Sequence, residues 1–265
     1  MKIDESIMQM EDEDQLWKEH QNLSAEFREN ISRWDEGLVR IEKRKPNYLD
    51  LKIKLATKLE NPCRICERKC ERKRLEGQQG YCLVPDKGSI ASSFLHPGEE
   101  IVLIPSGTIF FNGCTFRCVF CQNWDIAHTK YLTDENLVSN LTTREQTLVQ
   151  QGARNLNYVG GDPSPNIKNI LESWTKIDRN ITQLFNSNQF LSEMGMKIIE
   201  DIFDFWLPDF KYWDDEFAFK HSKVKNYRST LTRNLKRCFE YGSGEMIIRH
   251  LVLPNRVEKD TIPIW

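Results

Sequence analysis

The sequence predicts an α/β fold organised around a parallel β-sheet. From residue 108 onward, short runs rich in β-branched and aromatic residues alternate with runs of helical periodicity. Glycines and polar residues follow directly after several of the predicted strands. Repeated strand–helix units favour parallel strands joined by right-handed crossovers, and functional groups then collect at the carboxyl ends of the strands.

The first part of the chain, residues 1–60, is predicted to be a helical extension. Residues 1–14 are expected to be frayed. Between residues 15 and 45, apolar residues recur at steps of four and three, and Pro46 ends this helix. These apolar residues form one stripe along the helix. The stripe favours docking of this helix onto the main domain over a coiled-coil partner helix, because fewer than three full heptads are sustained. A second helix is predicted over 48–59. The apolar stripe consists of Leu23, Phe27, Ile31, Trp34, Leu38 and Ile41.

A cysteine-rich segment, residues 61–105, follows. Four thiolates within about twenty residues can saturate a tetrahedral zinc ion or hold an auxiliary iron–sulfur cluster, and the spacing does not decide between them. A solvated turn around a structural metal is favoured over a nucleic-acid patch, because exposed aromatic residues do not interleave with its basic residues. Short strands are predicted at 89–94 and 100–104. The four cysteines are Cys63, Cys66, Cys70 and Cys82.

The main domain is predicted to span residues 106–265. Strands are predicted at 108–112, 155–160, 182–185, 203–210 and 245–253, and helices at 143–151, 166–177, 192–201 and 231–241.

Three more cysteines follow the first of these strands and an Asn-Gly turn. Cys114, Cys118 and Cys121 have the spacing CxxxCxxC. Thiolates are soft ligands that select zinc, copper(I) or iron–sulfur clusters. A structural zinc or an ordinary four-iron cluster takes four protein ligands, so three thiolates leave one coordination position open for chemistry. The alternatives are buried cysteines without a ligand role or part of a zinc site.

This motif, with Phe120 just before its last cysteine, resembles the signature of the radical S-adenosylmethionine (radical SAM) superfamily. Within it, the likeness is to the pyruvate formate-lyase activating enzyme and its uncharacterised relatives, in which a CxxCxxxC segment and a later cysteine often precede the motif. The resemblance implies that Cys114, Cys118 and Cys121 hold a [4Fe-4S] cluster whose fourth iron binds S-adenosylmethionine. Such an oxidoreductase cleaves this cofactor by one-electron reduction to a 5′-deoxyadenosyl radical that abstracts hydrogen.

The resemblance also implies a partial (β/α)6 barrel, which is a partial TIM barrel. Phe120 would shield the cluster and the adenine end of the cofactor from water. An electron donor such as a flavodoxin or ferredoxin is expected, and a glycine in a partner enzyme is the target that the family suggests.

Two strand ends match motifs that bind the cofactor in this family. Gly160, Gly161 and Asp162 resemble a GGE motif whose backbone binds the amino group of the cofactor, and Asp162 replaces the usual Glu, which keeps the charge but shortens the reach of the side chain. A plain turn is the alternative. Asn188 ends an Asn-Ser-Asn segment in which Asn186 replaces the carboxylate of an Asp-Thr-Asn-like motif.

The last two predicted strands supply further candidates. Asp209 and Lys211 resemble an Asp-Leu-Lys motif and are the candidate catalytic residues, since side chains two apart on a strand share a face. A surface ion pair is the alternative. Arg249 is the candidate partner of the cofactor carboxylate, because a guanidinium can bind it bidentately. His250 is expected to be structural.

Composition excludes some classes of protein. The net charge of −2 gives no bulk electrostatic case for nucleic acid or an anionic membrane. No run of transmembrane length and no signal peptide is seen, so a reducing cytoplasm is expected. Seven of the eight cysteines fall in the two groups, which favours metal binding over disulfides.

The chain ends at Trp265, just after the fifth predicted strand. The barrel is therefore expected to be truncated at its C-terminus, with an open edge at the fifth strand. A truncated, non-catalytic protein that binds iron–sulfur clusters or zinc is the alternative to an active enzyme.

Overall fold

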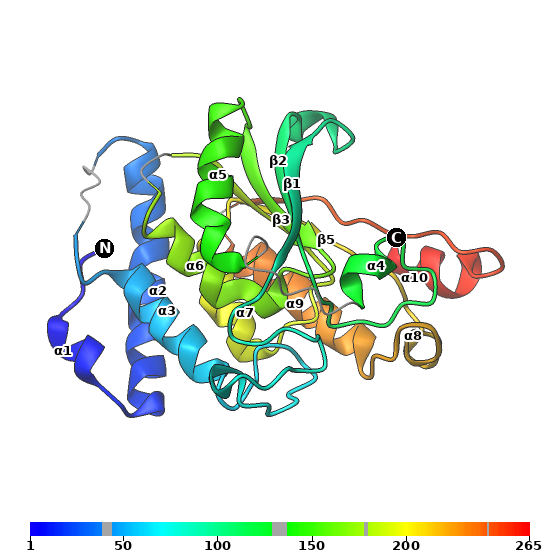
Figure 1. Ribbon diagram of the computed structural model, residues 1–265, viewed down its shortest axis with the longest axis horizontal. Helices are drawn as coiled ribbons and strands as arrows, with labels where there is room; N and C mark the ends of the chain where they lie inside the picture. Colours follow the sequence, from blue (N-terminus) through cyan, green and yellow to red (C-terminus); the bar gives the residue numbers. More distant parts are fainter. Residues whose placement is uncertain (39–43, 129–136, 178–179, 243) are drawn as a thin grey trace.

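The computed structural model describes residues 1–38, 44–128, 137–177, 180–242 and 244–265. Within them lies one six-stranded sheet in the order β1 to β6 (Figure 1). β1 is antiparallel to β2, and every later neighbour pair is parallel. The strands are β1 (Ile90–His96), β2 (Ser106–Phe111), β3 (Asn155–Gly160), β4 (Thr182–Ser187), β5 (Phe205–Pro208) and β6 (Glu245–Met246).

The predicted α/β class and parallel main sheet are confirmed, with two corrections. The strand expected at 100–104 is a single 3-10 turn, Ile101–Leu103, in which Leu103 is buried while Ile101 and Val102 are exposed and pair with no strand of the sheet. The strand expected at 245–253 has regular pairing only at β6. Beyond β6, single hydrogen bonds continue the pairing as far as Arg249.

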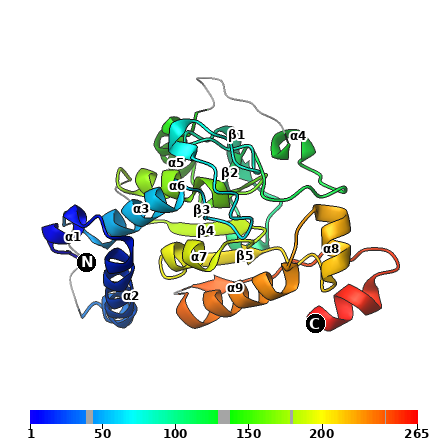
Figure 2. The same cartoon turned by 90° about the horizontal axis from the view of Figure 1, so that it is seen from below.

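Helices cover the outside of the sheet. Figure 2 shows α5, α6, α7 and α9 in an arc around the strands, with α1, α2 and α3 at one end and α4, α8 and α10 at the other. The helices are α1 (Glu5–Gln9), α2 (Glu13–Asp35), α3 (Tyr48–Leu59), α4 (Trp124–Ala127), α5 (Leu141–Gln150), α6 (Ile167–Trp174), α7 (Glu193–Ile199), α8 (Asp215–Ser222), α9 (Tyr227–Tyr241) and α10 (Ile262–Ile264), with a π-helical turn at Val257–Thr261. The sequence did not predict α8.

The N-terminal extension is helical, as predicted, but its first residues are ordered. α1 forms where frayed chain was expected, because the Asp4 side chain caps it and Ile3 and Ile7 are buried. The long helix α2 ends before Leu38, which is 67% exposed. Ile41 of the predicted stripe lies outside the described residues. No helix of the described part of the chain is long and apolar enough to cross a membrane.

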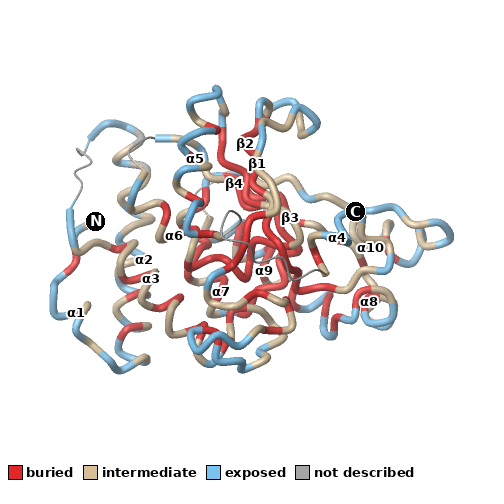
Figure 3. Tube along the Cα trace, in the orientation of Figure 1, coloured by how far each residue is buried: buried red, intermediate tan, exposed pale blue. Residues whose placement is uncertain are grey.

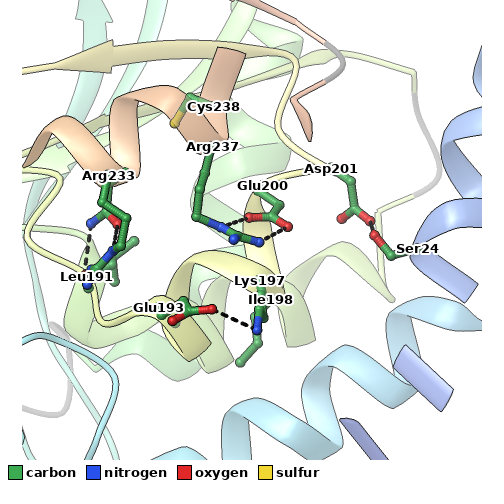
Figure 4. Close-up of polar contacts among 12 residues, drawn as sticks. Ser24, Leu191, Glu193, Lys197, Ile198, Glu200, Asp201, Arg233, Arg237 and Cys238 are labelled. Carbon is green, nitrogen blue, oxygen red and sulfur yellow. Dashed lines mark hydrogen bonds and ion pairs between the residues drawn. The ribbon is translucent and has the colours of Figure 1, made fainter. Parts of the chain in front are cut away.

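A buried polar network fastens the extension to the sheet domain. Lys52 of α3 and Asp201 after α7 form an ion pair of 2.6 Å whose side chains are fully buried. Ser24 of α2 and Tyr48 donate hydrogen bonds to the same carboxylate. Figure 4 shows the Ser24 contact and, beside it, polar contacts of Arg233 and Arg237 of α9 with Leu191 and Glu200, which flank α7. A buried charge needs its partner, so this network specifies how α2 and α3 dock.

The buried residues form one large core, a smaller cluster around Cys114, and a minor third group that includes Leu184 of β4 and Leu207 of β5. The large core joins apolar residues of α1 to α3 with those of the sheet and its outer helices. Figure 3 shows burial concentrated along the strands. The smaller cluster surrounds Cys114 and contains aromatic residues from the ends of the strands and from α9. It lies at the carboxyl end of the sheet, where the candidate site is found.

Candidate active site

The candidate site begins where β2 ends. The chain turns there into the segment 112–121, which carries three cysteines and is named the cysteine loop. Gly113 has a φ of +85°, and a Cβ at this position would lie 2.5 Å from the carbonyl oxygen of Cys82. The same carbonyl accepts a hydrogen bond of 3.2 Å from the N–H of Cys114. Only glycine permits this close backbone approach.

The cysteine loop and the ends of β3, β4 and β5 enclose a cavity of about 500 Å³. Groups that follow parallel strands meet at one edge of the sheet, as expected for this fold class. Among the residues that were predicted for the site, the cavity is lined by Cys114, Cys118, Phe120, Cys121, Gly160, Gly161, Asn188, Asp209 and Lys211. It is also lined by Phe116, Gln122, Asn123, His128, Leu251 and Leu253.

Of the three cysteines of the loop, Cys114 is buried, and Cys118 and Cys121 are half-buried. Burial raises the pKa of Cys114, Cys118 and Cys121 above that of an ordinary thiol. The nearby ammonium group of Lys211 opposes this rise in pKa at Cys118 and Cys121. A thiol must lose its proton to bind a metal, so a cation beside the thiolates favours the ligand form.

A chain of polar contacts crosses the cavity. The Nζ of Lys211 donates to Asp209 Oδ2 at 2.5 Å and to Asn188 Oδ1 at 2.9 Å. The Nδ2 of Asn188 in turn donates to Cys114 Sγ at 3.3 Å. Burial alone would lower the pKa of Lys211, but the Asp209 carboxylate and the Cys118 sulfur raise it on balance. Lys211 is therefore a charged group beside the cysteine loop.

The glycine pair at the end of β3 packs against the cysteine loop. A Cβ at Gly161 would lie 2.1 Å from the carbonyl oxygen of Gly113, and one at Gly160 would lie 2.2 Å from the N atom of Phe111. Larger residues would push the loop away from the sheet. The backbone of Gly161 nevertheless faces the cavity, so this packing role is compatible with the predicted cofactor contact.

Two predicted site residues do not line the cavity. Asp162 is buried and accepts hydrogen bonds from Thr115 and Ser164. Burial raises the pKa of Asp162, and these two donors oppose the rise. Arg249 forms ion pairs with Glu99 and Glu100, which occupy its guanidinium.

The four upstream cysteines form a compact group. The side chains of Cys63 and Cys70 are hydrogen-bonded. A Cβ at Gly80 would lie 3.2 Å from Cys82 Sγ and 3.5 Å from Cys70 Sγ. The hydrogen bond with Cys70, together with burial, raises the pKa of Cys63, and burial raises the pKa of Cys82. The fully buried Arg74 guanidinium opposes both rises in pKa and so favours the thiolate forms. Among the described residues, no three His, Cys, Asp or Glu side chains converge closely enough to hold a single metal ion.

A stack of three side chains connects the upstream cysteine segment with the cysteine loop. The ring of Tyr81 lies between two guanidinium groups, with Arg68 at 3.6 Å and Arg117 at 4.4 Å from its centroid. Arg68 donates to the carbonyl of Thr115 at 2.5 Å, and Arg117 donates to the carbonyl of Tyr81. The upstream segment therefore packs against the cysteine loop and supports it.

Sequence reasoning missed several residues of the cavity. Leu251 and Leu253 were assigned to a strand without a site role, although their spacing of two places them on one side of an extended chain. His128, which follows the last cysteine of the loop by seven residues, was also missed. Its nearness to the motif in the sequence was an available signal.

Comparisons with known proteins agree with this geometry. The family model described as "Radical SAM superfamily" matches residues 108–264, which include every residue that lines the cavity. An uncharacterised protein of Methanocaldococcus jannaschii is 40% identical to the chain over 226 residues. The match covers 83% of this chain and 65% of that relative, so the chain spans about two thirds of the relative's length.

Proposed function

The chain belongs to the radical SAM superfamily, and on this premise we propose that it holds a [4Fe-4S] cluster on Cys114, Cys118 and Cys121 and cleaves S-adenosylmethionine reductively. When bound, the cluster would supply the electron that breaks the sulfonium bond, and the resulting 5′-deoxyadenosyl radical would abstract hydrogen from a substrate. The observation that carries this proposal is the single cavity lined by the three cysteines, Asn188 and Lys211.

The residues present fit such a cluster. Three thiols that line one cavity provide the soft donor set that iron–sulfur clusters require and leave one iron for the cofactor. In a cluster, each thiolate binds a different iron atom. The cysteines therefore need to surround a volume, and they do not need to converge on one point.

The other lining residues have roles that follow from their chemistry. Phe120 and Leu253 exclude water from the cavity, which strengthens the electrostatic interactions inside it. Lys211 provides a cation for the carboxylate of S-adenosylmethionine, because the guanidinium of Arg249 is held by two glutamates. Asp209 and Asn188 orient the ammonium group of Lys211. Gly160 and Gly161 allow close approach of the ligand to the backbone.

We also propose that Cys63, Cys66, Cys70 and Cys82 bind a second metal centre, either zinc or an auxiliary iron–sulfur cluster. The proximity of the thiols and the buried cation Arg74 support this proposal. Positive charge next to several thiolates offsets the repulsion between them.

An electron donor such as a flavodoxin or ferredoxin would supply the electron. By family likeness, the substrate would be a protein with a glycine target. Both are proposals for the whole protein, since the chain matches only part of its longer relative.

The direct test is anaerobic reconstitution with iron and sulfide, followed by reduction in the presence of S-adenosylmethionine. We expect the native chain to form 5′-deoxyadenosine and the Cys118→Ala variant to form none. Cys238→Ala is the matched control, because Cys238 is a buried cysteine outside both groups. No product above the level of Cys118→Ala would contradict the enzyme and favour a non-catalytic metal-binding protein.

Metal counts assign the two groups separately. We expect Cys114→Ala to lose the iron of the cysteine loop, and Cys63→Ala to lose the metal of the upstream group. If Cys114→Ala loses iron and Cys63→Ala does not, the upstream group holds no auxiliary iron–sulfur cluster. If Cys63→Ala loses zinc, the upstream group is a zinc site.

A further inference from the structure

Helix α8, which the sequence did not predict, ends against the cysteine loop. The backbone N–H of Arg117 donates to the carbonyl of Ser222 at 3.0 Å, and the N–H of Val119 donates to the carbonyl of His221 at 2.9 Å. The last carbonyls of a helix have no partner within the helix, so these loop N–H groups satisfy them. The end of α8 and the cysteine loop are thereby held in a defined register.

Two hydroxyl groups lead from this helix end to a cysteine. Ser222 Oγ donates to Cys118 Sγ at 2.9 Å, and Tyr212 Oη lies 2.6 Å from Ser222 Oγ. Both side chains are fully buried. A serine hydroxyl has one proton, and a metal-bound thiolate can only accept. When Cys118 ligates iron, the proton of Ser222 is directed to the sulfur. The Tyr212 hydroxyl lies within hydrogen-bonding reach of both Ser222 and Cys118, so its proton strengthens the donation to this sulfur through Ser222 or directly.

From this geometry we propose that Ser222, polarised by Tyr212, raises the reduction potential of the cluster bound by the cysteine loop. Cluster potential depends on hydrogen bonds to the ligand sulfurs. Reduction adds negative charge to the cluster and its thiolates, so a donor at Cys118 stabilises the reduced form more than the oxidised form. The second hydroxyl strengthens the first hydrogen bond, since linked hydrogen bonds polarise one another. This inference rests on the proposed function.

Packing holds the Tyr212 ring and the chain that leads from it to α8. The ring of Tyr212 packs edge-on against Tyr227 at 5.3 Å and against Phe120 at 6.2 Å between centroids. The chain between Tyr212 and α8 is also held, because Asp260 accepts the N–H groups of Trp213 and Asp214 at 2.8 and 3.0 Å. Ser222 and Tyr212 are thus positioning residues that act through Cys118 without lining the cavity.

The test is a redox titration of the anaerobically reconstituted full chain, monitored by electron paramagnetic resonance without S-adenosylmethionine. We expect Ser222→Ala to lower the equilibrium constant for one-electron reduction about tenfold, which is a shift of about 59 mV to lower potential. Tyr212→Phe keeps the ring and Ser222, so its shift should have the same sign and be smaller. Ser229→Ala is the matched control, because Ser229 is exposed and its hydroxyl donates to the backbone carbonyl of Asn226.

Iron content and thermal unfolding of each variant are measured alongside the potential. A full complement of iron with an unchanged potential in both Ser222→Ala and Tyr212→Phe would overturn the inference and leave the proposed function intact. If Ser222→Ala loses iron, Tyr212→Phe decides the question. A native chain that takes up no iron would overturn the proposed function, and this inference with it.

Discussion

Lys211 and Arg249 are the two cations that the sequence placed at strand ends, and the structure gives them different surroundings. Lys211 lines the cavity, and its side chain is 14% exposed. Arg249 pairs with Glu99, whose side chain is 6% exposed, and with Glu100 at 2.9 Å. A cation already bound by two carboxylates is a poor partner for a third. The side chains around each cation, and not its place on a strand, therefore decide its role.

We expect Lys211→Met to lower kcat/KM for S-adenosylmethionine at least about tenfold, because a hydrogen bond to a charged group is worth about 1.5–3 kcal/mol. Arg249→Met should leave this constant within about twofold and lower Tm, since it removes the ion-pair partner of the buried Glu99 carboxylate. Steady-state formation of 5′-deoxyadenosine and thermal unfolding measure the two effects. If Arg249→Met lowered kcat/KM and Lys211→Met did not, the carboxylate-binding role would belong to Arg249.

Buried Glu145 connects three elements. This residue of α5 is fully buried and accepts hydrogen bonds from Tyr158 of β3 at 2.7 Å and from Ser173 of α6 at 2.8 Å. Burial raises the pKa of Glu145 to about 7, although both donors oppose the rise. Its second oxygen has no hydrogen-bond partner in the described structure. The packing of α5 and α6 on the sheet therefore favours a neutral carboxyl group.

Stability should consequently depend on pH through this residue. The folded chain holds the proton of Glu145 more tightly than the unfolded chain, whose carboxyl has a pKa of about 4.5. Its contribution to the free energy of unfolding is complete below about pH 4.5 and is lost as the pH rises through about 7. Glu145→Gln removes this loss, so its stability relative to the native chain should increase with pH, by up to on the order of 3 kcal/mol.

Urea unfolding of both proteins at about pH 5 and about pH 8 measures this difference. Glu240→Gln, at an exposed position of α9, is the control and should show no such trend. A constant difference between Glu145→Gln and the native chain across this range would show that Glu145 is ionised in the folded chain.

At the scale of the whole molecule, segments far apart in the sequence form one support for the cysteine loop. The upstream cysteine segment supplies Arg68 and Tyr81, and the loop supplies Arg117 to the same stack. Arg68 also donates to the carbonyl of Lys223, just beyond α8. The loop is thereby held by the upstream segment on one side and by α8 on the other.

Tyr81→Ala should therefore accelerate iron loss from the cysteine loop severalfold, although Tyr81 ligates nothing, because a partly buried cation–π contact contributes about 1–2 kcal/mol. The rate of iron release to a chelator measures this effect. The chain offers a matched control in Tyr241, which also has two guanidinium neighbours, Arg28 and Arg237, on a different face. Equal release rates for Tyr81→Ala and Tyr241→Ala would show that the upstream segment does not support the loop.

Much of the fold could be predicted because its signals are local. Strand β3 was predicted with its observed bounds, and the helices α5, α6 and α7 were predicted within a few residues. α8 was missed because its apolar pattern is weak and its end is stabilised by contacts with the cysteine loop, about 100 residues earlier in the chain. The apolar run at Ile101–Leu103 resembled a strand, but the structure leaves Ile101 and Val102 exposed in a 3-10 turn outside the sheet.

The sequence by itself determined the spacing of Cys114, Cys118 and Cys121, the alternation of strands and helices, and the glycines at the strand ends. These features are set by neighbours along the chain. Only the tertiary structure decided that Lys211 and not Arg249 lines the cavity, that Ser222 donates to Cys118, and that the two cysteine-containing segments contact each other. The physical reason is that burial and hydrogen-bond partners depend on which distant segments pack together, and residue spacing does not encode that choice.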